Sequence, residues 1–259
     1  MNVLLTNDDG IKAAGLRALL HAMPEGVRVH VVAPASEKSA CSHSISLGQK
    51  LRVEQFSANG VQEYVVHGTP VDCVKFALSE LKGFKPDLIL SGINQGANTG
   101  VSVYYSGTIS AAREGLINGV PSVAISLCSR MSINFEASLA FVQTLLCGYR
   151  DGMFLLDNML NVNIPDLPLG KIQGVKITKQ AASRFIEEFV ANTERDGKKV
   201  YTLAGEIELL DGDGTSDEEA IMKGYISVTP LKLDLTDYSA MSFLTHWSEN
   251  RFSQGDTHP

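Results

Sequence analysis

Two adjacent aspartates close to the start of the chain, Asp8 and Asp9, could bind a divalent cation. They follow a short apolar run, residues 3–6, of the kind that forms a strand buried on both faces of a parallel sheet. Ligands of open α/β sheets bind just outside the carboxyl ends of such strands. Neighbouring carboxylates repel each other unless a cation or a proton lies between them. The alternative role, capping the helix expected near Lys12, would explain only one of the pair.

The loop after the next expected strand carries a second set of polar side chains. Its small oxygen and nitrogen groups, which could approach a metal or a phosphate, belong to Ser36, Ser39, Ser42, His43 and Ser44. Serine-rich loops are often no more than solvated turns. A single histidine with no carboxylate near it in the sequence is also more often a surface or packing residue than a catalyst. The residues of this loop alone therefore leave its role open.

A glycine-rich loop, residues 91–100, follows a third expected strand, and its glycines recur at every fourth position. Glycines let backbone amides approach an anion closely, while Asn94 and Asn98 offer neutral oxygen and nitrogen groups. Beyond this loop, the segment Tyr-Ser-Gly-Thr precedes an expected helix, whose N-terminal amides would form a seat for a phosphate. Ser106 or Thr108 could equally be the N-cap of that helix, and the two roles are compatible.

Apolar runs of strand length alternate with runs of helical periodicity along most of the chain. Strands are expected at residues 3–6, 27–33, 88–91, 122–126 and 160–164, and helices at residues 13–23, 71–81, 109–118 and 135–149. This alternation predicts an α/β fold, a Rossmann-like, doubly wound and mostly parallel sheet with helices on both faces. Before the second helix, Thr69, Pro70 and Asp72 have the pattern of a capped helix start, so we interpret that segment as structural.

The pattern changes after about residue 179. The elements expected there are two hairpin strands at residues 185–190 and 199–204, a solvated acidic loop at 211–219, a strand at 225–229 and a terminal helical run. The hairpin is indicated by Asp196 and Gly197, a dipeptide typical of tight turns. We therefore expect an α/β core at residues 1–182. The C-terminal hairpin, strand and tail, residues 183–259, would pack on that core and serve oligomerisation.

Composition limits the classes of protein to which this chain can belong. Its 259 residues, 44% of them hydrophobic, can bury a sizeable core. No run has the apolar length of a transmembrane helix, and the start lacks the regions of a signal peptide, so we expect a cytoplasmic enzyme without a membrane partner. The formal net charge of −7 argues against binding a large nucleic acid. The four cysteines lack CxxC spacing, which favours free thiols.

Five motifs resemble, in order and spacing, those of the SurE (survival protein E) family of metal-dependent nucleotidases: TNDDG, APxxxxSAxxHSI, GTPxDCVK, SGINxGxNxG and YSGTxxAAxEG. The resemblance implies a hydrolase of phosphoric monoesters, a 5′-nucleotidase that releases phosphate from nucleoside 5′-monophosphates. Some members of the family also act on 3′-monophosphates and short polyphosphate. The resemblance further implies a homodimer or homotetramer, built through exchanged C-terminal segments.

By this resemblance, one divalent cation per subunit would be held by Asp8, Asp9, Ser39 and Asn94. The two aspartates would also be the catalytic residues. We expect the phosphate and the rest of the substrate to be bound by Asn98, Ser106, Gly107, Thr108, His43 and Ser44.

Carboxylate, hydroxyl and amide oxygens are hard ligands, which suit Mg²⁺ or Mn²⁺ and not zinc. Such a cation neutralises charge on the phosphoryl oxygens and lowers the pKa of bound water. The sequence leaves open whether water or an aspartate is the nucleophile. The alternative functions are a phosphatase of another small phosphomonoester and a non-catalytic nucleotide-binding module. Receiver domains and haloacid-dehalogenase-like phosphatases fit less well, because receivers are much shorter and those phosphatases space their acids as DxD.

Overall fold

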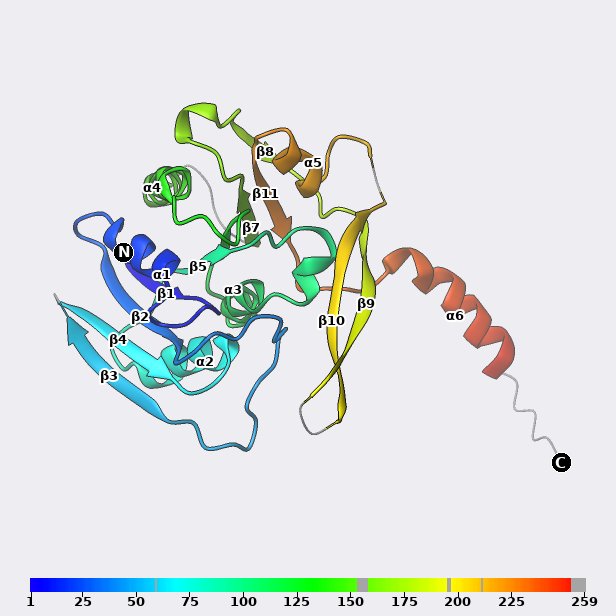
Figure 1. Ribbon diagram of the computed structural model, residues 1–259, viewed down its shortest axis with the longest axis horizontal. Coiled ribbons are helices and arrows are strands. Elements are labelled where there is room, and N and C mark those ends of the chain that lie inside the picture. The colour runs from blue at the N-terminus through cyan, green and yellow to red at the C-terminus, as the bar shows by residue number, and fades with distance from the viewer. Residues whose placement is uncertain (59, 153–157, 195–196, 211, 253–259) are drawn as a thin grey trace.

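A nine-stranded sheet runs through the protein in the computed structural model (Figure 1). The structure describes residues 1–58, 60–152, 158–194, 197–210 and 212–252. The strands of this sheet are β1 (Asn2–Thr6), β2 (Arg28–Pro34), β3 (Val53–Ala58), β4 (Val61–Val66), β5 (Leu88–Gln95), β6 (Ser122–Leu127), β7 (Met159–Ile164), β8 (Val175–Ile177) and β11 (Ile226–Leu231). They lie in the order β3-β4-β2-β1-β5-β6-β7-β11-β8. β3 is antiparallel to β4 and β11 to β7, and the other neighbouring pairs are parallel.

Helices cover both faces of the sheet. On one face, α1 (Ala14–His21) and α4 (Glu136–Arg150) contribute apolar residues to a core that includes alternate residues of β1, β2 and β5. On the other face, α2 (Pro70–Glu80) and α3 (Gly107–Ile117) pack against the opposite side chains of the same strands. The predicted strands of the core and these helices are present with small shifts at their ends, and the doubly wound α/β fold is confirmed.

The start of α2 has the predicted cap. The Thr69 side chain accepts a hydrogen bond from the Asp72 backbone N–H, and the Asp72 carboxylate accepts one from the Thr69 N–H at 2.8 Å. The same carboxylate accepts hydrogen bonds from the backbone and hydroxyl of Ser46, at 3.0 and 2.7 Å. Asp72 therefore both caps the helix and fixes the end of the serine-rich loop.

The direction of winding changes between β1 and β5, which are paired neighbours. From β1 the chain continues outward through β2 and β4, and from β5 it continues outward on the other side through β6 and β7. The carboxyl ends of β1 and β5 therefore form the crevice at which doubly wound sheets bind their ligands. Asp8 and Asp9 follow β1, and Asn94 lies near the end of β5. The topology brings these predicted site residues to one place.

Two parts of the chain differ from the sequence-based expectation. Strands β3, β4 and β8 were not predicted; β3 and β4 carry many polar residues at one edge of the sheet. The expectation of a solvated loop up to residue 219 is wrong at its end, because α5 (Asp217–Met222) begins there with Ser216 as its N-cap. Ser216 and Asp217 are fully buried. The Asp217 carboxylate accepts hydrogen bonds from the backbone N–H groups of Gly100 and Ala181, at 3.1 and 2.9 Å.

A long hairpin projects from the body of the protein (Figure 1). Its strands, β9 (Ser183–Thr193) and β10 (Lys199–Leu209), pair antiparallel and are longer than predicted. The predicted turn residue Asp196 lies outside the described residues. β11, which follows the hairpin in the chain, lies inside the central sheet, and α6 (Tyr238–Phe252) extends away from the sheet.

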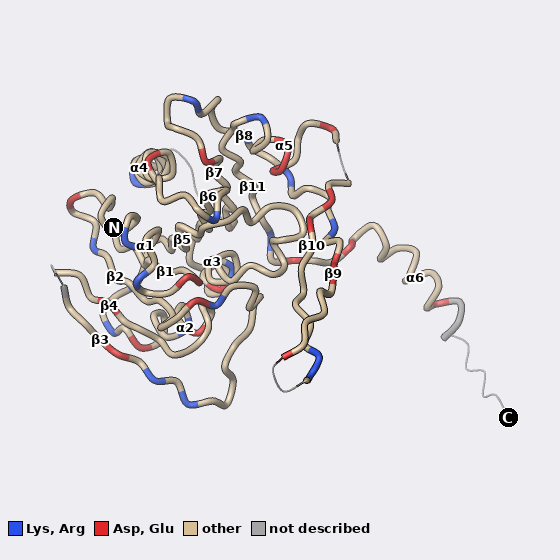
Figure 2. The backbone as a smooth tube through the Cα atoms, viewed as in Figure 1, with Lys and Arg blue, Asp and Glu red and all other residues tan. Residues whose placement is uncertain are grey.

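Acidic and basic residues are interspersed along the chain, and Figure 2 shows no extended basic stripe on the described residues. Within the described ranges, no helix has both the length and the apolar character needed to cross a membrane.

Gly15 of α1 allows the helix to lie directly on β5. A Cβ atom at this position would be 2.0 Å from the backbone oxygen of Ile93, far inside van der Waals contact. We expect Gly15→Ala to lower the free energy of unfolding by about 2 kcal/mol, because either the helix or the strand beside Asn94 must shift. Urea denaturation measures this loss. Gly170→Ala is the matched control, because a Cβ on Gly170 meets nothing within 4 Å, and an equal loss in the control would contradict the close-packing argument.

Candidate active site

The turn after β1 fixes the two aspartates at the crevice. The Asn7 side chain donates a hydrogen bond to the Gly10 backbone oxygen at 2.9 Å and accepts one from the Gly10 N–H at 3.2 Å. Gly10 has φ +101°, a conformation that favours glycine. The Ile11 N–H then donates to the Pro34 oxygen at 2.9 Å, which ties this turn to the end of β2. A short, rigid turn therefore presents Asp8 and Asp9 beyond the strand.

The site disfavours the charged forms of both carboxylates. Burial, together with the nearby charges of Asp8 and Glu37, raises the pKa of Asp9 to about 7. Burial also raises the pKa of Asp8, although the hydrogen bond from Thr108 opposes that shift. Placing acidic groups this close in a partly buried site disfavours their charged forms, and a bound cation would reverse that preference.

The start of α3 packs directly against Asp8. The Thr108 hydroxyl donates a hydrogen bond to the Asp8 carboxylate, and Thr108 is fully buried. A Cβ on Gly107 would lie 2.8 Å from the Cβ of Asp8, so only glycine allows this approach. Ser106 is the N-cap of α3, and its hydroxyl accepts a hydrogen bond from the Ile109 N–H at 3.1 Å. The interpretation of Ser106 as an N-cap is confirmed.

The serine-rich loop brings Ser39 and Glu37 to the same crevice. The Lys38 N–H donates to the Asp8 backbone oxygen at 2.7 Å, and the Ser39 hydroxyl donates to the Glu37 carboxylate at 2.6 Å. Ser42 holds the far side of the loop, because its N–H and hydroxyl donate to the backbone oxygens of Tyr105 and Tyr104.

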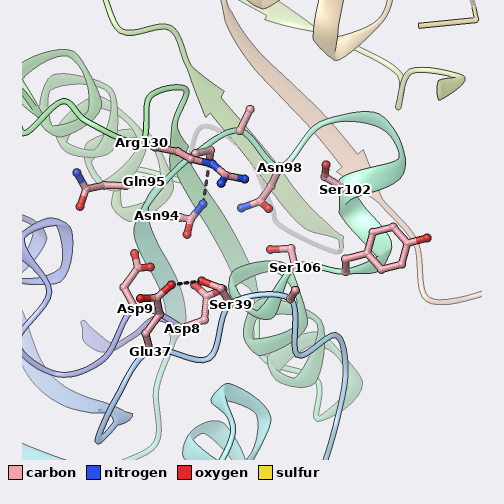
Figure 3. Close-up of a pocket in the computed structure, with 14 residues that line it drawn as sticks. Asp8, Asp9, Glu37, Ser39, Asn94, Gln95, Asn98, Ser102, Ser106 and Arg130 are labelled. Carbon is pink, nitrogen blue, oxygen red and sulfur yellow. Dashed lines mark hydrogen bonds between the residues drawn. The ribbon is translucent and has the colours of Figure 1, made fainter. Parts of the chain in front are cut away.

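Asn94 and Asn98 form the opposite side of the crevice. The Asn94 amide nitrogen donates to the Gly96 oxygen at 2.7 Å, and Figure 3 shows the side-chain oxygen on the side of Asp9. Asn98 is held more firmly, because its side-chain nitrogen donates to Ser126 and its backbone N–H donates to the Asn163 side chain, both at 2.8 Å. The Asn161 side chain in turn donates to the Asn98 backbone oxygen at 2.7 Å.

These groups surround a cavity of about 440 Å³ (Figure 3). Its lining comprises Asp8, Asp9, Glu37, Ser39, Ala40, Asn94, Gln95, Gly96, Ala97, Asn98, Ser102, Tyr105, Ser106 and Arg130. The structure thus brings the predicted metal ligands together with Asn98 and Ser106. Glu37 and Arg130 were missed by the sequence analysis, because single charged residues in loops carry no motif of their own.

Other predicted site residues lie beside the cavity and do not line it. Gly107 and Thr108 are behind Asp8, where they fix its position. His43 has its Nε2 atom 3.0 Å from the Glu114 carboxylate, which also accepts a hydrogen bond from Lys75 at 2.7 Å. The Ser44 backbone oxygen accepts a hydrogen bond from the Thr69 hydroxyl. A direct role of His43 and Ser44 in substrate binding stays a prediction.

The donor set fits a hard divalent cation. Asp8, Asp9, Ser39 and Asn94 all line one cavity and supply carboxylate, hydroxyl and amide oxygens. Among the described residues, no three or more His, Cys, Asp or Glu side chains gather as a metal cluster. Together with the aspartates, the neutral oxygens of Ser39 and Asn94 would form a donor set typical of Mg²⁺ or Mn²⁺.

Comparison with known proteins agrees with this geometry. The family described as "Survival protein SurE" matches residues 3–187. The chain belongs to the SurE family. A 5′-nucleotidase SurE from Chlorobium chlorochromatii is 42% identical over 247 residues, which cover 95% of this chain and 91% of the relative. One from Desulforudis audaxviator is 44% identical over 254 residues, covering 95% and 97%.

A solved SurE structure has the same fold. The crystal structure of the SurE protein from Aquifex aeolicus superposes with a TM-score of 0.81 and is 36% identical, covering 96% of this chain and 100% of that one. The similarity to SurE proteins therefore extends beyond the matched family region into the hairpin and the C-terminal strand.

The substitution Asp9→Asn tests whether the Asp9 carboxylate serves function or stabilises the fold. Without metal, the pKa of Asp9 is about 7, above its ordinary value of 3.8. Ionising Asp9 therefore destabilises the metal-free fold progressively as the pH rises from about 4 to 7. In excess chelator at pH 8, we expect the free energy of unfolding of Asp9→Asn to exceed that of the wild type, because the variant has no charge to bury. Solvent screens part of the effect, so the expected difference is about 1–2 kcal/mol.

The same variant should lose kcat by orders of magnitude and should show no rise in melting temperature when Mg²⁺ is added. Thermal melts at pH 5 and pH 8, with and without Mg²⁺, test both statements. A variant that is less stable than the wild type at pH 8 would identify Asp9 as a cap of the turn.

Proposed function

We propose that this protein hydrolyses nucleoside 5′-monophosphates to nucleosides and phosphate with the help of a divalent cation. The observation that carries the proposal is the pair of aspartates at the winding switch, opposite the neutral oxygen of Asn94 and beside the start of α3. Relatives that are over 40% identical across 95% of the chain are named 5′-nucleotidase SurE. Nucleoside 3′-monophosphates and short polyphosphate are further candidate substrates with the same phosphate chemistry.

In this proposal, one cation per subunit is held by Asp8, Asp9, Ser39 and Asn94. When bound, Mg²⁺ or Mn²⁺ supplies positive charge to the phosphoryl oxygens and acidifies a coordinated water. To bind a cation, Ser39 would turn a lone pair of its hydroxyl toward the ion and away from the Glu37 carboxylate, to which it donates a hydrogen bond in this structure.

The chain's own groups then position the phosphate. Ser106, the N-cap of α3, lies at the cavity wall with its hydroxyl, where the N-terminus of the helix would stabilise an anion. Asn98, fixed by Ser126 and Asn163, would donate the remaining N–H of its side-chain amide from the other side. Thr108 orients Asp8 by its hydrogen bond, which leaves the less buried Asp9 as the carboxylate able to accept a proton from the attacking water.

Phosphate release from a panel of substrates tests this function. With Mg²⁺ or Mn²⁺, we expect turnover of adenosine and guanosine 5′-monophosphates, and complete loss of it in excess chelator, with recovery when the metal is restored. Full turnover in chelator would overturn the metal-dependent mechanism.

The same panel includes the matching 3′-monophosphates, tripolyphosphate and a sugar phosphate. Activity on the sugar phosphate alone would instead support a phosphatase of another small phosphomonoester. Nucleotide binding without turnover of any compound would support the non-catalytic binding module.

We further propose that the chain forms a homodimer or homotetramer through its C-terminal region, residues 183–259. One face of the hairpin carries Phe189 and Leu203, which are directly paired across the strands, and Tyr201 beside them. Their exposed fractions are 66%, 56% and 60%, an apolar surface that a second subunit would cover. Helix α6 adds further exposed apolar residues, among them Phe243 and Leu244.

Replacing Phe189, Tyr201 and Leu203 together by serine should disrupt assembly without unfolding the core, because these side chains contact solvent and none lines the cavity. Sedimentation is expected to show smaller particles than for the wild type, with catalysis reduced less than assembly. An unchanged oligomer would contradict the role of this face. Ile177→Ser, which removes an exposed apolar residue of β8, is the control.

We also place the reaction in the cytoplasm. The four cysteines are free in the structure, and a reducing compartment keeps such thiols unpaired.

A further inference from the structure

The cavity has an excess of negative charge for a site that receives a phosphate. Its lining contains the carboxylates of Asp8, Asp9 and Glu37 and, among the described residues, a single cation, Arg130. A divalent cation held by the aspartates offsets two of these charges, and Glu37 then still repels a phosphate dianion. Among the described residues that line the cavity, Arg130 is the group that can oppose that repulsion.

Arg130 lies on the wall that faces the aspartates (Figure 3). It follows the end of β6, at the same edge of the sheet as the ends of β1 and β5. In Figure 3 its side chain extends beside Asn94 and toward Asn98, across the cavity from Asp8 and Asp9. The Cγ and Nε atoms of Arg130 lie 3.7 and 3.9 Å from the position that a Cβ on Gly96 would occupy, which places the arginine stem along the glycine-rich loop.

The loop that carries Arg130 is tied to the sheet at its base. The Gly96 N–H donates to the Leu127 oxygen at 2.8 Å, and the Cys128 N–H donates to the Ile164 oxygen at 2.8 Å. The Gln95 side chain donates to the Ser132 oxygen at 2.7 Å on the far side of Arg130. These bonds hold the backbone on both sides of the arginine, so its side chain leaves from a fixed position.

The guanidinium group of Arg130 has N–H donors that are available to a ligand. Within the described parts of the chain, no acidic group lies within ion-pair distance of Arg130 and no acceptor is hydrogen-bonded to it, although most other arginines of the protein contact a protein acceptor. A guanidinium carries five N–H donors in a planar fork that matches two oxygens of a phosphate. An unpaired fork inside a cavity lined by Asn98 and Ser106 is suited to an anionic ligand.

We propose that Arg130 binds the non-bridging oxygens of the substrate's phosphate from the side opposite the metal, and that it selects phosphate dianions. This assignment rests on the proposed function and names a specificity residue for it. A phosphomonoester or inorganic phosphate presents two charged oxygens to the fork, whereas a phosphodiester carries one charge less. Arg130 therefore favours monoesters over diesters and also strengthens the binding of the phosphate product.

The test compares Arg130→Gln, which removes the charge, with Arg130→Lys, which keeps the charge and loses the fork. We expect Arg130→Gln to raise KM for a nucleoside 5′-monophosphate and the inhibition constant of inorganic phosphate by about 10- to 100-fold, the effect of one hydrogen-bonded charge. kcat should fall less than KM rises. Arg130→Lys should lie between the wild type and the glutamine variant.

Lys12→Gln is the matched control. It removes the same charge close to the turn of the two aspartates, but Lys12 lines a different cavity, together with Arg17, Phe56 and His67. The control should change both constants less than twofold. Equal effects in Lys12→Gln and Arg130→Gln would show a long-range charge effect and would overturn direct binding, as would an unchanged phosphate inhibition constant in Arg130→Gln.

Calorimetric titration of inorganic phosphate in the presence of Mg²⁺ separates this inference from the proposed function. If the wild type released no phosphate from any nucleotide, the proposed function would fail. Weaker phosphate binding by Arg130→Gln than by the wild type would still support direct binding of phosphate by Arg130, which we call the arginine clamp. Equal phosphate affinity in the two proteins would overturn the clamp even if the nucleotidase activity were present. Arg130 is exposed, so circular dichroism and melting temperature should be unchanged in both variants.

Discussion

The mutual repulsion of Asp8 and Asp9 is the constraint on which the rest of the site depends. Burial and adjacency together move the pKa of Asp9 to about 7, so the metal-free protein holds a charge arrangement that is unfavourable by itself. When neither a cation nor a proton relieves the repulsion, a rigid surrounding keeps the pair in place. The Asn7 turn, the Thr108 hydroxyl and the backbone bond from Lys38 supply that rigidity.

Glycines make this arrangement compact. Gly107 lets the start of α3 touch Asp8, and Gly15 lets α1 lie on the strand that carries Asn94. At both positions, the Cβ atom of any other residue would collide with the neighbouring element. As a result, oxygens from the turn after β1, from β5 and from the serine-rich loop line one cavity at the winding switch, together with Ser106 at the start of α3.

The sequence predicted the core strands, the helices and the hairpin, because apolar periodicity and turn residues are local signals. It also predicted that Asp8, Asp9, Ser39 and Asn94 would lie close together, since each lies at or just after the carboxyl end of a strand of the parallel sheet, whereas His43 and Ser44 do not line the cavity. It could not reveal that His43 pairs with Glu114 or that Asp217 is buried, because those partners are distant in the chain. Arg130 had no signal of its own, and the polar strands β3 and β4 lack the apolar run of a core strand.

The buried bonds of Asp217 make the glycine-rich loop dependent on a residue more than one hundred positions further along the chain. Every proposed metal ligand precedes residue 95, so a growing polypeptide contains the complete ligand set long before it contains the carboxylate that holds Gly100. During synthesis, the bonds that hold Asn98 to Ser126 and Asn163 can therefore form before the one that holds Gly100, which requires α5 to emerge from the ribosome. The order of the elements thus makes the Gly100 end of the loop the last part of the crevice to be fixed.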